Sequence, residues 1–187
     1  MTIRDCIAPD RNPKKPSITL PKGSIDTHVH IFENHFPLFE GRGYNPPDST
    51  LEDLIHLHDT LGIDRVVFTQ PSVYGVDNAA ILKGMNELNK KVPNKARGVC
   101  AIKMDATENF LQELHDQGIR GVRLNLDNKG GMPLELSEIS RLEDKIKGFG
   151  WHLEYLFPGK DMVELEPVLA NASVPVSIGH FAYQPAI

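Results

Sequence analysis

Short apolar segments alternate with amphipathic helical segments from residue 24 to residue 181. We expect strands at 24–32, 63–70, 96–103, 119–126, 151–157 and 174–181, and helices at 49–62, 77–91, 106–118, 137–150 and 161–172. The strand segments are mostly apolar runs of Val, Ile and Leu, as parallel strands covered on both faces require. This alternation is typical of an α/β protein with a parallel sheet.

Two architectures produce such an alternation, a doubly wound open sheet and a (β/α)₈ barrel. No GxGxxG segment follows the first expected strand, which argues against a dinucleotide-binding doubly wound sheet. Polar residues gather at the C-terminal ends of the expected strands, where barrels place their active sites. These residues are His28, His30, Gln70, Ser72, Lys103, Arg123, Asn125, Glu154 and His180. We therefore predict an α/β fold of the (β/α)₈ TIM-barrel type.

The predicted barrel is incomplete. A complete (β/α)₈ barrel takes roughly 250 residues, whereas this chain has 187 residues and ends seven residues after His180. We expect an irregular, Pro-rich N-terminal arm at 1–23 and a partial barrel of about six β/α units at 24–187. Open sheet edges expose unpaired backbone and apolar surface. We therefore expect a truncated chain, or self-association through the open barrel edge.

Composition excludes several functional classes. The net charge is −5 and no face of clustered Lys and Arg is evident, so we expect no nucleic-acid partner. No apolar run approaches about 20 residues and the N-terminus lacks the apolar core of a signal peptide, so we expect no membrane partner. Cys6 and Cys100 lie far apart without a CxxC spacing, which indicates free thiols in a reducing compartment. We expect a cytoplasmic protein.

A pair of histidines ends the first expected strand. His28 and His30 are two residues apart, so their side chains leave the same face of a strand, which Asp26 is expected to share. Two convergent imidazoles bind a divalent metal or polarise a carbonyl. His180, at the end of the sixth expected strand, is a candidate third imidazole. The alternative is that one histidine of the pair packs in the core and the other is solvated.

Several further side chains are candidates for binding a ligand. Arg123 and Asn125 share one face of the fourth expected strand, where a guanidinium suits a substrate carboxylate. The alternative for Arg123 is an ion pair with a neighbouring acid, and Glu154 is either an acid–base residue or the partner of a Lys or Arg. The other candidates, in the loops after the first and second strands, are Tyr44, Gln70, Ser72 and Asn78.

Other histidines are expected to serve structure. His56, His58 and His115 lie on expected helices, so we interpret them as surface or helix-packing residues. His152 opens the fifth expected strand and therefore lies nearer the face of a barrel that serves stability.

Five segments together resemble a known family. They are "IDTHVHIF", "LGIDRVVFTQPSVYGVDN", "GIRGVRLNL", "GFGWHLEYLF" and "VPVSIGHFA". In this order they resemble the amidohydrolase superfamily, and within it the amidohydrolase 2 branch that contains 2-pyrone-4,6-dicarboxylate lactonase and sugar-lactone hydrolases and isomerases.

The resemblance implies a hydrolase that opens a lactone. His28, His30 and His180 match the histidines that polarise the scissile carbonyl for attack by water, and Arg123 matches an arginine that grips a substrate carboxylate. Gln70, Ser72 and Tyr44 match substrate contacts. The resemblance implies that no cofactor is required, or that one divalent metal, Zn or Mn, binds His28 and His30 as in other branches.

The sequence also departs from the family pattern. The catalytic aspartate of the family ends an eighth strand, for which this chain has no counterpart, so we expect impaired hydrolysis. Only Lys129 is available to bind a second carboxylate, which argues against a dicarboxylate substrate. The alternatives are a metal-dependent amidohydrolase or decarboxylase of the same superfamily, or a non-catalytic truncated remnant.

Overall fold

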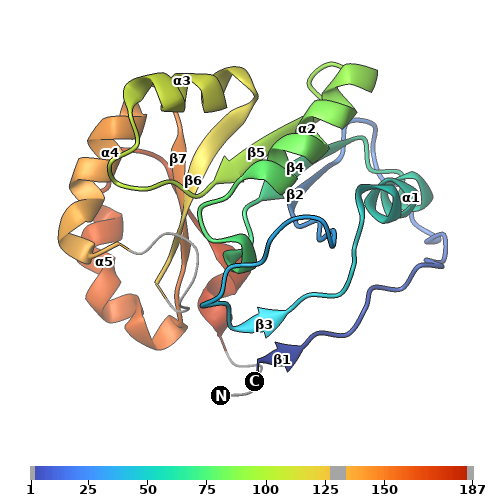
Figure 1. Cartoon of the computed structure of the whole chain (residues 1–187), viewed down its shortest axis with the longest axis horizontal. Helices are drawn as coiled ribbons and strands as arrows, with labels where there is room; N and C mark the ends of the chain where they lie inside the picture. The colour runs from blue at the N-terminus through green and yellow to red at the C-terminus, as the bar shows by residue number, and fades with distance from the viewer. Residues whose placement is uncertain (1–2, 127–133, 185–187) are drawn as a thin grey trace.

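A six-stranded parallel sheet forms the centre of the molecule (Figure 1). The computed structural model describes residues 3–126 and 134–184. The strands follow one another across the sheet in chain order: β2 (Ile25–Val29), β4 (Arg65–Thr69), β5 (Ala96–Cys100), β6 (Ile119–Asn125), β7 (His152–Leu156) and β8 (Val176–Ile178). A doubly wound sheet reverses its strand order at a switch point, and this sheet has no reversal. The prediction of an incomplete TIM-barrel type fold is therefore confirmed.

Within the described residues, five α-helices connect the strands and cover the outer face of the curled sheet (Figure 1). They are α1 (Leu51–Leu61), α2 (Ala79–Lys91), α3 (Glu108–Asp116), α4 (Ile139–Lys147) and α5 (Met162–Ala170). The core lies between these helices and the outward side chains of the strands. Its largest fully buried members include Phe68, Met85, Ile119, Trp151 and Tyr155. No helix among the described residues is long and apolar enough to cross a membrane.

Local sequence signals fix the ends of the helices. Thr50 begins α1 in a capping box, in which its hydroxyl accepts the Asp53 backbone N–H and the Asp53 carboxylate accepts the Thr50 backbone N–H. Gly62 ends α1 with a φ of +78°, a left-handed conformation that glycine adopts without steric cost. Thr107 caps α3 by accepting a hydrogen bond from the Phe110 backbone N–H.

The N-terminal segment is tied to the loop after β2. Its short strand β1 (Arg4–Asp5) pairs in parallel with β3 (Tyr44–Asn45), and the Cys6 N–H donates to the Asn45 carbonyl oxygen at 3.0 Å. Most side chains of residues 3–23 are exposed. The arm therefore fastens the loop that carries Tyr44 and adds little to the core.

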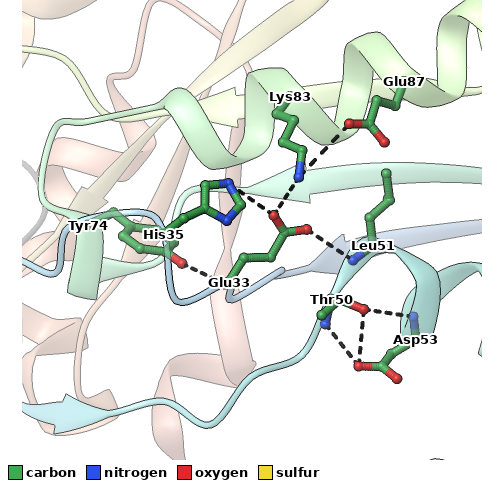
Figure 2. A network of polar contacts seen from close by, with 8 residues as sticks. All are labelled: Glu33, His35, Thr50, Leu51, Asp53, Tyr74, Lys83 and Glu87. Carbon is green, nitrogen blue, oxygen red and sulfur yellow. Dashed lines mark hydrogen bonds and ion pairs between the residues drawn. The ribbon is translucent and has the colours of Figure 1, made fainter.

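A buried carboxylate fixes the backbone just after β2 (Figure 2). Glu33 is only 7% exposed, and its carboxylate accepts the Leu51 N–H at the start of α1 (3.4 Å) and Lys83 Nζ from α2 (2.6 Å). His35 Nε2 lies 3.4 Å from the same carboxylate, and the Glu33 N–H donates to the Tyr74 hydroxyl oxygen. A negative charge at the N-terminus of a helix is stabilising. Glu33 thus locks the loop after His30 to two helices.

Candidate active site

A β-bulge in β2 sets the direction of its side chains. Asp26 pairs with Val66 and Val29 pairs with Phe68, so three steps along β2 face only two along β4. One extra residue in a strand turns two consecutive side chains toward the same face. Thr27 and His28 accordingly both line the cavity on the concave side of the sheet.

The bulge places Asp26 on the opposite face from His28, so the expectation that the two share a face is wrong. The Asp26 carboxylate lies 3.1 Å from Nε2 of His58, a buried residue of α1. Burial raises the pKa of Asp26, but the hydrogen bonds from the His58 side chain and the His28 backbone N–H, together with the electrostatic effect of both residues, leave this pKa below its ordinary value. His58 is thus a helix-packing residue, one of the two roles expected for it, and it joins α1 to β2.

Three of the predicted imidazoles meet at the C-terminal end of the sheet. The ring centroids of His28 and His30 are 5.1 Å apart, and those of His28 and His180 are 4.9 Å apart. His180 follows β8 in a left-handed turn, with positive φ at four consecutive non-glycine residues from His180 to Tyr183. Its ring stacks on Tyr183 with centroids 5.3 Å apart. The sheet therefore brings together side chains that are about 150 positions apart in the sequence.

His30 is held as a neutral imidazole with a defined tautomer. Its Nδ1 lies 2.7 Å from the Thr69 carbonyl oxygen. A carbonyl oxygen only accepts, so Nδ1 carries the proton and Nε2 keeps its lone pair. Burial, followed by the positive charge of Arg123, lowers the pKa of His30 from 6.5 to about 3. His30 is therefore an acceptor at Nε2 over the whole physiological pH range.

The pKa of His30 predicts a pH dependence of stability. Between the unfolded pKa of 6.5 and the folded pKa of about 3, the unfolded chain binds a proton that the folded chain does not, so stability falls as pH decreases. When the pH is lowered from about 5.5 to about 4, the free energy of unfolding of His30→Asn should fall by about 2 kcal/mol less than that of the wild type. Urea unfolding at each pH measures this difference. His56→Asn, which changes an exposed histidine of α1, is the control, and parallel curves for wild type and His30→Asn would contradict the prediction.

Glu154 joins His28 and Arg123 at the base of the site. Its carboxylate lies 3.5 Å from His28 Nδ1 and 3.3 Å from Arg123 Nε. Glu154 is 5% exposed and Arg123 is 6% exposed. Burial raises the pKa of Glu154, but the contact with His28 and the charge of Arg123 outweigh it and leave this pKa below its ordinary value. The sequence predicted that Glu154 is either an acid–base residue or the partner of a Lys or Arg. In the structure it forms an ion pair with Arg123.

A cavity of about 590 Å³ opens on the concave side of the sheet beside these groups. Its polar lining comes from Thr27, His28, His152, Glu154, Ser177 and His180. The Nδ1–H of His152 donates to the Arg120 carbonyl oxygen at 2.9 Å, which fixes the ring over the sheet. His152 thus lines the same cavity as the candidate catalytic residues, from the opposite end of β7.

Tyr44 and Ser72 come together from two different loops. Tyr44 lies in β3, and its hydroxyl is hydrogen-bonded to the Ser72 side chain. Burial raises the pKa of Tyr44, and the nearby Arg123 opposes this shift. These three predicted residues therefore lie near one another. Asn125, also predicted, is buried two residues beyond Arg123 at the end of β6.

Gln70 binds the main chain of the loop after β4, and Asn78 joins this loop to the main chain just after β5. Gln70 Nε2 donates to the carbonyl oxygens of Gly75 (3.1 Å) and Asp77 (2.7 Å). The Asn78 amide donates to the Ala101 carbonyl oxygen (2.7 Å) and accepts the Ala101 N–H (3.0 Å). These bonds favour a role in shaping the loop for both amides. Lys129, the candidate for a second carboxylate, lies outside the described residues.

The described residues do not form a complete metal site. Across residues 3–126 and 134–184, no group of three or more His, Cys, Asp and Glu side chains is placed to hold a metal ion. His28 and His30 are two adjacent imidazoles, whereas catalytic zinc sites in proteins usually take three protein ligands.

Comparison with known proteins points to one family. The chain is 34% identical over 171 residues to 2-pyrone-4,6-dicarboxylate hydrolase of Comamonas testosteroni, covering 90% of the chain and 55% of the relative. It is 32% identical over 184 residues to 4-sulfomuconolactone hydrolase of Rhizobium radiobacter, covering 96% and 60%. The apo crystal structure of Agrobacterium tumefaciens ATU3138 matches with a TM-score of 0.76 at 28% identity, covering 86% of this chain and 57% of that one.

The sequence match to the family covers nearly the whole chain, including every strand of the six-stranded sheet. The chain spans somewhat more than half the length of the relatives that it matches. The family model described as amidohydrolase matches residues 25–186, from the first residue of β2 to beyond β8. The chain belongs to the amidohydrolase family.

Proposed function

We propose that the protein is a lactonase-type hydrolase that opens a cyclic ester at the site beside His28, His30 and His180. The observation that carries the proposal is the convergence of these three imidazoles next to Arg123, with centroid distances of 4.9 and 5.1 Å. Two relatives at 32–34% identity are named as hydrolases, one of a pyrone dicarboxylate and one of a sulfomuconolactone. A lactone is also the chemical class of substrate that a carbonyl-polarising site serves.

The three imidazoles would have different roles in catalysis. His30 is neutral with a lone pair at Nε2, so it would accept a hydrogen bond from the attacking water. His28 and His180 would donate to the carbonyl oxygen and stabilise the negative charge that develops there. The Glu154 carboxylate, 3.5 Å from His28 Nδ1, would hold the orientation of the His28 ring. Each donor to a developing oxyanion is typically worth about 3–4 kcal/mol of the activation barrier.

Substrate binding would use side chains that lie near the histidines. Arg123 would pair with a carboxylate of the substrate, and Tyr44 and Ser72 would contact the ring or its substituents. Asn125 lies next to Arg123 on the same strand face. Gln70 and Asn78 would act by holding the loop of residues 75–78 in place.

A metal-dependent amidohydrolase or decarboxylase is the second candidate function. The free lone pair on His30 Nε2 favours it, because a histidine that ligates a metal usually donates its other ring N–H to a carbonyl or carboxylate. One divalent ion, Zn²⁺ or Mn²⁺, would then bind His28 and His30 and polarise the carbonyl. Elemental analysis of the purified chain distinguishes the two, because one equivalent of either metal, lost in a His28→Ala/His30→Ala variant, favours the second.

Hydrolysis of lactones by the whole 187-residue chain tests the main proposal. The assay follows ring opening of neutral and carboxylated lactones by the release of acid. Turnover that is resistant to chelators supports the metal-free mechanism. A chain that hydrolyses none of these lactones under conditions in which it is folded refutes the proposed function and favours a non-catalytic role.

We also propose a structural division into an arm at residues 1–23 and a partial barrel at residues 24–187. The sheet ends in β2 on one side and β8 on the other. Ile25, Val176 and Ile178 on these edges are 38–44% exposed. These apolar edges support the expected self-association, which sedimentation velocity measures directly.

A further inference from the structure

The cation that would bind a substrate carboxylate already has a buried anion beside it. Arg123 and Glu154 are both more than 90% buried, and their charged groups are 3.3 Å apart. Arg123 Nη1 also donates to the Gln70 carbonyl oxygen at 3.1 Å. Charges interact more strongly in a buried site than in water, so Glu154 cancels much of the attraction that Arg123 exerts on an anion.

The electrostatic neighbours of the site reinforce this balance. The groups that act on the Glu154 charge are His28, Arg123 and His152. In this set Arg123 is the fixed cation and Glu154 is the fixed anion. The charge of Arg123 is therefore largely offset by Glu154, which itself lines the 590 Å³ cavity.

We propose that Glu154 determines substrate specificity, and that it restricts the site to lactones that carry at most one carboxylate. This inference rests on the proposed lactonase function and adds a substrate class to it. A single carboxylate has Arg123 as its partner and tolerates Glu154 nearby. A second carboxylate on the same substrate finds no other fixed cation among the groups around Glu154, and the Glu154 charge repels it.

Binding of planar aromatic acids to the full chain tests the proposal. Benzoate carries one carboxylate and isophthalate carries two, and isothermal titration gives the dissociation constant of each. The wild type should bind isophthalate no more tightly than benzoate. Glu154→Gln, which removes the charge, should bind isophthalate about tenfold more tightly than the wild type does, which corresponds to one favourable charge interaction.

Two variants control this comparison. Glu154→Asp keeps the charge and should bind both acids as the wild type does. Glu143→Gln changes another buried carboxylate, which accepts the Ser173 N–H and hydroxyl at 3.0 Å on the outer side of the sheet, and should also leave binding unchanged. If Glu154→Gln does not fold, the ratio of the isophthalate and benzoate dissociation constants of the wild type still tests the proposal.

The proposal is overturned by three results. They are a wild type that binds isophthalate at least about tenfold more tightly than benzoate, a Glu154→Gln variant without the gain, and a Glu154→Asp variant with the same gain. The expected binding pattern without any lactone hydrolysis would refute only the proposed function. Lactone hydrolysis without the effect of Glu154→Gln would refute only the role of Glu154.

Discussion

Arg123→Leu is expected to lower the free energy of unfolding by about 3–5 kcal/mol, because it leaves the Glu154 carboxylate buried without its cation. Glu154 is 5% exposed and has few ways to regain solvent. The substitution also removes the hydrogen bond from Arg123 Nη1 to the Gln70 carbonyl oxygen. Urea denaturation followed by circular dichroism measures the loss.

A second substitution separates the ion pair from ordinary packing. Glu154→Leu in the Arg123→Leu background should recover most of the stability, because a buried ion pair replaced by apolar side chains of similar volume is often neutral or stabilising. Glu143→Leu is the matched control, since it removes a buried carboxylate of α4 that does not touch Arg123. Glu143→Leu and Arg123→Leu should be additive. If the effects of Glu154→Leu and Arg123→Leu were also additive, Arg123 and Glu154, which are 3.3 Å apart, would have no coupling energy.

The fold was accessible from the sequence because its signals are local. Helix caps such as Thr50 and Thr107 and the C-terminal Gly62 stand beside apolar periodic runs, so each helix appears close to its expected place. Chain-order pairing follows from short β–α–β connections, which place successive parallel strands next to each other. The strands are shorter than expected. Their polar ends, such as Gln70 and Lys103, extend past the hydrogen-bonded ladder into the loops.

The site was only partly accessible. Histidines at the ends of the first and sixth strands converge because all parallel strands end at the same rim, a rule that needs no coordinates. The direction of Asp26 depends instead on the bulge, which arises from the register between β2 and β4 and has no marker in "SIDTHVHIF". Period-two alternation alone therefore placed Asp26 on the wrong face.

The contact between His28 and Glu154 was beyond the reach of sequence patterns. β2 and β7 are separated in the sheet by β4, β5 and β6, so their side chains meet only because the sheet curls. The amount of curl follows from the twist and packing of the whole sheet. Glu33 was missed for a similar reason. Its partners Leu51 and Lys83 belong to two different helices (Figure 2). A single Glu after a strand does not indicate in the sequence that it binds either of them.

His28→Ala is expected to have the largest effect on activity. His28 stands between His30 and His180, and its Nε2 is shielded from solvent without a hydrogen-bond partner among the described residues. A buried polar atom without a partner is costly unless a ligand supplies one. Loss of one donor to a developing oxyanion lowers kcat by about 100- to 1000-fold. We therefore expect kcat/KM for lactone hydrolysis to fall by about this factor, mostly through kcat.

The control for this prediction is His56→Ala, which removes an exposed imidazole from α1 and should leave kcat/KM within about twofold of the wild-type value. Thermal unfolding of both variants verifies that each is folded at the assay temperature. An effect on KM alone would mean that His28 binds the ground state and the transition state equally well. Full activity of His28→Ala would remove His28 from the chemistry and leave His180, with Arg123 behind it, as the group that polarises the carbonyl.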